Sequence, residues 1–122
     1  MDGKSVANLL SPECLPGGFT YPREFVRVVE LGLTDLEPWL VLEGEGLMER
    51  YAGLRKRYPG RNVIPFARRI DNDDIACWDL DRDARVVIVH DFASPGWERQ
   101  GEFESFYDWL RRAVEDLIEY DT

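Results

Sequence analysis

The chain has little positive charge, one histidine, two cysteines and no long apolar run. Its 122 residues carry 15 basic and 24 acidic side chains, which gives a formal net charge of −9. Binding to a nucleic-acid backbone needs clustered Lys and Arg, so the composition argues against nucleic acid as a partner, and equally against anionic membranes. No segment approaches the roughly 20 apolar residues that a transmembrane helix needs.

The start of the chain and its cysteines favour an intracellular setting. Residues 1–10 contain Asp2 and Lys4 and no apolar run of signal-peptide length. Cys14 and Cys77 are far apart and do not form a CxxC motif. Cysteines in such a pattern are more often reduced and structural than bridged. We therefore expect a cytoplasmic protein that folds without a disulfide.

Residues that usually carry catalysis are sparse. A Ser-His-Asp or Cys-His arrangement would have to use His90, the single histidine. The adjacent Asp91 cannot orient the imidazole, because neighbouring residues in a strand point to opposite faces. There is no glycine-rich loop ending in GK[ST]. Carboxylates are numerous enough for general acid–base chemistry, yet nothing marks one pair as buried. We expect no enzymatic activity and no cofactor.

Two acidic clusters resemble cation sites only in part. One is the run at 71–74, and the other comprises the aspartates of segment 79–83. The second cluster matches the first ligands of an EF-hand loop, but Ala84 stands where glycine is needed and His90 where a bidentate glutamate is needed. Because both clusters adjoin predicted strands, solvated turn residues are the more common outcome. We expect no metal site.

The strongest strand signals lie in the middle of the chain. Two apolar runs, Ile75–Trp78 and Val86–Val89, flank a connection short enough for a hairpin. The second run is apolar on both faces, so we expect it inside the sheet rather than at an edge. Segment 36–42 is short and apolar and contains a proline, which favours an extended segment such as an edge strand. Segment 97–101 is polar apart from its tryptophan and is expected to be an exposed loop.

Helical periodicity completes the fold. The predicted class is α+β: a single antiparallel sheet with a central hairpin of residues 75–80 and 86–90, packed by helices near 22–31, 45–58 and 105–119. A chain of this length fits one domain, spanning residues 1–122, that buries about two-thirds of its unfolded surface.

The last helix has the clearest pattern. Ser105 is its predicted N-cap within a capping box. The predicted apolar stripe, with Asp116 placed on the opposite polar face, comprises Phe106, Leu110, Val114 and Leu117. Two tryptophans, Trp97 and Trp109, have no place in that stripe: they either contact a protein partner or cover the edge of the sheet.

Several short motifs, in this order and spacing, resemble the SUKH superfamily of Smi/Knr-type domains. The resemblance covers about residues 15–117. Its motifs are Leu15-Pro16, Ile64–Ala67, the acidic run Asp71–Asp74 before strand Ile75–Asp79, Val86–Asp91, and Glu104–Leu110. The chain departs from the family pattern at Arg68–Ile70, where members often carry glycines.

This resemblance implies an α+β fold and a binding role. Many bacterial members are implied to be immunity proteins that bind and neutralise toxins, including nucleases, whereas others are regulatory scaffolds. The resemblance implies no catalytic residues.

We therefore expect a non-enzymatic protein-binding domain, and first an immunity protein for a basic toxin domain; the alternative is a regulatory interaction module without a toxin partner. The negative charge suits a basic partner because opposite fields speed encounter, although an acidic surface also serves solubility alone. The expected contact residues, chosen by predicted exposure, are Asp71, Asp73, Asp74, Trp97 and Glu98.

Overall fold

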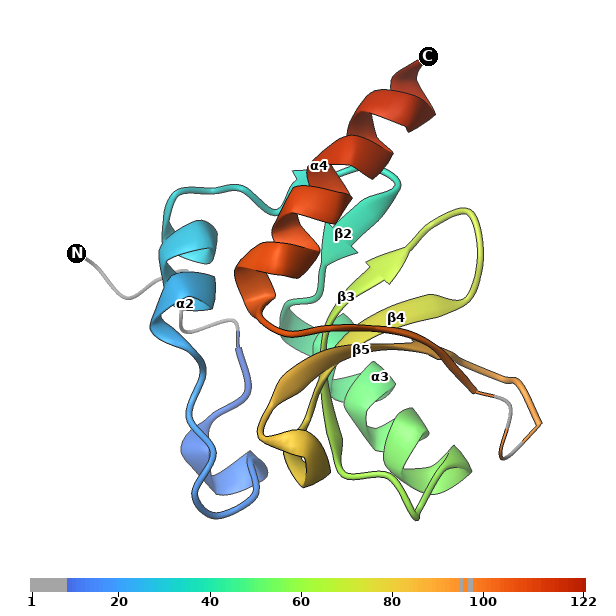
Figure 1. Cartoon of the computed structure of the whole chain (residues 1–122). Helices are drawn as coiled ribbons and strands as arrows, with labels where there is room; N and C mark the ends of the chain where they lie inside the picture. Colours follow the sequence, from blue (N-terminus) through green and yellow to red (C-terminus); the bar gives the residue numbers. More distant parts are fainter. Residues whose placement is uncertain (1–8, 95, 97) are drawn as a thin grey trace.

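One antiparallel sheet forms the centre of the molecule. The computed structural model describes residues 9–94, 96 and 98–122. Six strands lie in chain order across the sheet (Figure 1), and their bounds are β1 Asp35–Leu36, β2 Trp39–Val41, β3 Val63–Arg69, β4 Asp74–Asp79, β5 Arg85–His90 and β6 Arg99–Phe103. All neighbouring strands pair antiparallel, which confirms the predicted fold class.

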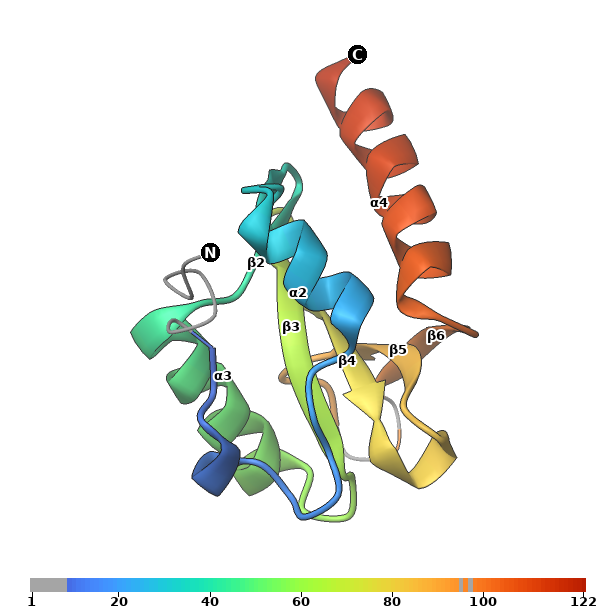
Figure 2. The same ribbon diagram turned by 90° about the vertical axis from the view of Figure 1, so that its left-hand side faces the viewer.

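Helices cover both faces of this sheet. Their bounds are α2 Arg23–Glu30, α3 Gly44–Arg57 and α4 Phe106–Asp121, with short 3-10 turns η1 Pro12–Cys14 and η2 Leu80–Arg82. Figures 1 and 2 place α3 on one face and α2 with α4 on the other. Within the described part of the chain, none of the helices combines the length and apolarity that crossing a bilayer requires.

The predicted central hairpin is confirmed. β4 and β5 pair along their full length, from Asp74 opposite His90 to Asp79 opposite Arg85. Asp79 caps the connecting turn η2, because its carboxylate accepts a hydrogen bond from the backbone N–H of Asp81 at 3.0 Å. β5 lies between β4 and β6, as its two-sided apolar pattern predicts.

The main core lies between the sheet and the α2/α4 layer, where it is built from aromatic rings. The ring of Phe66 lies 4.5 Å from that of Trp78 and 4.9 Å from that of Trp109, and Phe25 of α2 lies 5.0 Å from Trp78. Phe66 reaches this face at a bulge, since the pairing of β3 with β4 shifts directly after Pro65. A proline has no N–H to donate, so a bulge is where a central strand tolerates it.

One predicted feature of the chain is wrong, and another is confirmed in part. Segment 97–101 is not simply a loop, because residues 99–103 form β6 and pair with β5. Segment 36–42 is extended, as predicted, but it contributes to two strands, of which β1 lies at the edge of the sheet.

The buried stripe of α4 also differs from the predicted one. Trp109 and Asp116 are buried, at 1% and 6% exposure, whereas Val114 is 40% exposed. Phe106 and Ala113 complete the buried face. The predicted N-cap is confirmed, with the Ser105 hydroxyl accepting from the N–H of Asp108 at 3.2 Å.

Candidate functional site

The acidic turn between β3 and β4 lies at one end of the sheet. Asp71 and Asp73 are exposed, and Asp74 begins β4 with its side chain half-buried. The turn is ordered by its own side chains, since Asn72 Oδ1 accepts from the N–H of Asp74 at 2.7 Å. The short turn between β1 and β2 lies alongside, with the N–H of Ile70 donating to the carbonyl of Pro38 at 2.8 Å.

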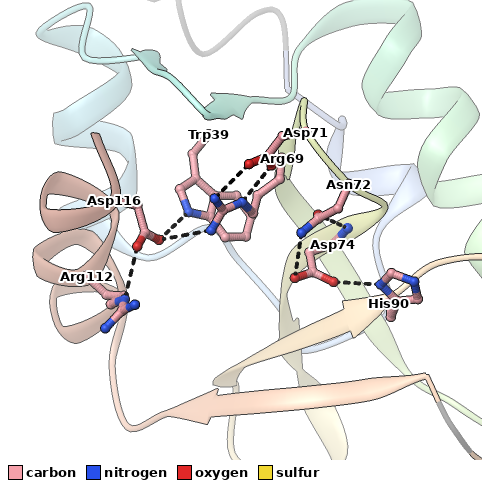
Figure 3. Close-up of polar contacts among 8 residues, drawn as sticks. All are labelled: Trp39, Arg69, Asp71, Asn72, Asp74, His90, Arg112 and Asp116. Carbon is pink, nitrogen blue, oxygen red and sulfur yellow. Dashed lines mark hydrogen bonds and ion pairs between the residues drawn. The ribbon is translucent and has the colours of Figure 1, made fainter. Parts of the chain in front are cut away.

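A buried carboxylate ties this end of the sheet to α4. Asp116 accepts hydrogen bonds from Trp39 Nε1 at 2.9 Å, Arg112 Nε at 3.1 Å and Arg69 Nη1 at 3.4 Å (Figure 3). Arg69 also donates two hydrogen bonds, of 2.9 and 3.0 Å, to the carboxylate of Asp71. The hydrogen bond from Arg69 lowers the pKa of Asp71, which keeps this carboxylate ionised. One arginine therefore fixes the turn against the helix.

Three separate segments bring acids to this region, which we call the acidic end. The two turns and the second half of α4 lie at the same end of the molecule in Figure 1. The acids are Asp35, Glu37, Asp71, Asp73, Asp74, Glu115, Asp116, Glu119 and Asp121. Arg69 and Arg112 form ion pairs with acids of this set, so the nine carboxylates and these two guanidiniums together carry a formal charge of −7, against −9 for the chain.

Apolar side chains stand among the acids on α4. The C-terminal end of this helix projects beyond the sheet (Figure 2). In the second half of α4, Val114, Ile118 and Tyr120 are 40%, 57% and 49% exposed. Exposed apolar groups that a polar rim surrounds are typical of surfaces that bind other proteins.

His90 gains a partner that the sequence did not indicate. Its Nδ1 lies 2.8 Å from Asp74 Oδ1 (Figure 3), because the two residues face each other across β4 and β5. Asp91 points to the other face, as expected, where its carboxylate binds Arg50 and Arg57. Among the described residues, no hydroxyl or thiol group hydrogen-bonds to the imidazole of His90. The His90–Asp74 pair therefore has no hydrogen-bonded nucleophile in this part of the chain.

The predicted contact residues do not all come together. Asp71, Asp73 and Asp74 belong to the acidic end, whereas Glu98 is 5% exposed and ion-paired with Arg61, so its predicted exposure is wrong. Burial by itself raises the pKa of Glu98, but the hydrogen bond and charge of Arg61 and two backbone N–H groups together outweigh it and hold the pKa below its usual value. Trp97 lies outside the described residues. Among residues 9–94, 96 and 98–122, no group of three or more His, Cys, Asp or Glu is arranged to hold a metal ion.

Comparison with known proteins gives no relative: no family model, no curated protein and no solved structure matches this chain.

Proposed function

We propose that this protein is a non-enzymatic binding domain of the SUKH type that acts in the cytoplasm as an immunity protein. Its target would be a basic toxin domain, such as a nuclease, which it would neutralise by stoichiometric occlusion. The observation that carries the proposal is the concentration of charge at the acidic end, a formal −7 against −9 for the chain. A strongly negative surface attracts a positive partner and raises the rate of encounter.

The internal ion pairs support this role because they leave the outer acids available. The shortest side-chain contacts of Arg69 and Arg112 are with Asp71 and Asp116, respectively, where α4 adjoins the sheet. Asp73 and Glu119 make no side-chain ion pair with any described residue, and both are exposed. A partner's Lys or Arg can therefore bind them without displacing an existing contact, which lowers the cost of association.

The apolar groups on α4 supply what charge alone does not. Long-range charge sets the association rate, whereas lifetime depends on a few desolvated anchors at the centre of an interface. Val114 and Ile118, four residues apart on one face of α4, are exposed beside its acids and fit that description. The proposal therefore assigns steering to the carboxylates and anchoring to these two side chains.

A regulatory module without a toxin partner is the competing function, and the neighbouring gene separates the two. The test is to co-express the product of the adjacent reading frame with this protein and measure growth. Under the proposal, the neighbour arrests growth when expressed alone, growth returns with the protein present, and the two purify as a complex of fixed stoichiometry. A harmless neighbour that forms no complex would contradict the immunity role.

A further inference from the structure

The α3 side of the sheet carries a cationic depression that the proposed function does not use. It has a volume of about 500 Å³ and is lined by Glu49, Arg50, Arg57, Arg68 and Phe92, with Leu42 and Gly46. Figure 2 shows α3 on the opposite side of the sheet from α4. Three guanidiniums in one hollow are unexpected in a chain with a net charge of −9.

A buried aspartate holds two of these arginines in place. Asp91 is 0% exposed and receives Arg50 Nη1 at 2.8 Å, and Arg57 Nε and Nη2 at 2.7 and 2.6 Å. The backbone N–H of Phe92 donates to the same carboxylate at 2.9 Å. Arg50 uses one of its five N–H donors and Arg57 uses two in these contacts, so both keep donors for a ligand. Their side chains are fixed before any ligand arrives, which reduces the entropy that binding must overcome.

The third arginine has no internal partner. Arg68 and Arg69 are consecutive in β3, so their side chains point to opposite faces of the sheet. Arg69 faces α4 and pairs with Asp71 and Asp116, whereas Arg68 is half-buried on the α3 side. The side chain of Arg68 makes no ion pair or hydrogen bond with any residue that the structure describes. A half-buried guanidinium without an anion is a ready donor for one.

An aromatic ring completes the wall of the depression. Phe92 is 62% exposed, and the guanidinium carbon of Arg57 lies 4.1 Å from its ring centroid. The ring therefore packs on Arg57 and remains open to solvent. Glu49 is exposed at the same hollow, so the local charges are three guanidiniums against the carboxylates of Asp91 and Glu49.

We propose that this depression binds a phosphate-sized oxyanion, either free phosphate or a phosphate monoester, with Arg68 as the principal contact and Arg50 and Arg57 beside it. Guanidinium forks suit the tetrahedral oxygens of phosphate, and charge-assisted hydrogen bonds are about twice as strong as neutral ones. This site shares no residue with the acidic end, so a negative result for one proposal leaves the other untouched.

The test is a titration with inorganic phosphate and with phenyl phosphate at constant ionic strength, followed by NMR. The expected result is a saturable shift of the Arg68 side-chain Nε–H and the Phe92 amide, with a dissociation constant on the order of millimolar or tighter. Arg68→Gln should weaken binding by about tenfold or more without loss of fold, because Arg68 has no structural partner. Tighter binding of phenyl phosphate, lost in Phe92→Ala, favours a phosphate monoester as the ligand; equal binding of the two favours the free ion.

The matched control is Arg55→Gln. Like Arg68→Gln it removes one positive charge, but from an exposed position on α3 that lies outside the depression. It should change the affinity less than twofold. The proposal is overturned if neither phosphate ligand shifts these signals, or if the Arg55 and Arg68 variants lose affinity equally, since that would indicate general charge screening.

Discussion

Replacing Asp91 by Asn should destabilise the protein strongly. Asp91 is fully buried and accepts three guanidinium hydrogen bonds and one backbone bond. Removing one partner of a buried ion pair costs about 3–5 kcal/mol. Because the side chains of Arg50 and Arg57 are 23% and 30% exposed, water can partly solvate the guanidiniums that lose their partner. We therefore expect a loss of about 2–4 kcal/mol, a large share of the roughly 5–15 kcal/mol of a typical domain.

The measurement is urea unfolding followed by tryptophan fluorescence, with the free energy extrapolated to water. Asp81→Asn is the control, because it removes the same charge from an exposed residue and should stay within about 0.5 kcal/mol of wild type. If the Asp91 variant is as stable as this control, the buried cluster does not anchor the segment after β5 to α3, and the reasoning fails.

The same experiment has a defined pH dependence. Burial by itself raises the pKa of Asp91, but hydrogen bonds from Arg57 and Arg50 outweigh it and leave the pKa below its ordinary value. A carboxyl whose folded pKa is depressed contributes stability above its unfolded pKa, about 3.9 for Asp, and loses it as pH falls through the folded value. The free-energy difference between wild type and Asp91→Asn should therefore be constant near neutrality and shrink below about pH 4.

Three further predictions follow from the structure. Ser105→Ala should cost about 1 kcal/mol in urea unfolding, because it removes the cap of α4, whereas Ser105→Gly should cost only a few tenths. Trp109→Ala should cost about 3–5 kcal/mol and Ile118→Ser less than about 0.5 kcal/mol, since the first is buried and the second exposed; equal costs would contradict the observed face of α4. A thiol reagent should modify Cys14 but not Cys77 in the native protein, since Cys77 is buried and burial raises the pKa of its thiol; both should react in urea.

Local patterns were sufficient for the centre of the fold. The two apolar runs of the hairpin are short, rich in β-branched or aromatic residues and separated by a tight connection, so their pairing is encoded nearby in the chain. Ser105 identifies the start of α4 in the same local way. β6 was missed because its sequence, RQGEF, is largely polar, and its pairing is set by the backbone of β5. An edge strand of this kind is protected by polar residues and has little apolar signature.

The buried face of α4 could not be read from periodicity alone. Two overlapping apolar stripes exist on this helix, and the sequence favoured the one that contains Val114. Val114 faces away from the core and is 40% exposed, while Trp109 fills the aromatic core. Asp116 can be buried because its carboxylate accepts three hydrogen bonds, one each from Trp39, Arg69 and Arg112. Trp39 and Arg69 are distant from it in sequence. The spacing of Arg112 and Asp116 was the single local signal for this site.

The candidate site had the same limit. The acids of the β3–β4 turn were identified from sequence, but their grouping with α4 depends on ion pairs between residues 47 positions apart. Glu98 was misplaced for the same reason, because its partner Arg61 lies 37 positions earlier in the chain. Charge partners that are distant in sequence leave no periodic trace, so burial of a charged residue is the feature that pattern reasoning predicts least well.

The most direct test is the rate of association with the proposed basic partner, the product of the neighbouring gene, measured by stopped flow at several salt concentrations. The variant Asp73→Asn/Glu119→Gln neutralises two acids of the acidic end, and Asp81→Asn/Asp83→Asn neutralises two exposed acids at the opposite end of β4. Both variants change the net charge equally. The first variant should slow association about twofold to tenfold at low salt, the second should have little effect, and the difference should fade as salt rises. Equal rates for the two variants, or a rate that does not depend on salt, would contradict docking at the acidic end.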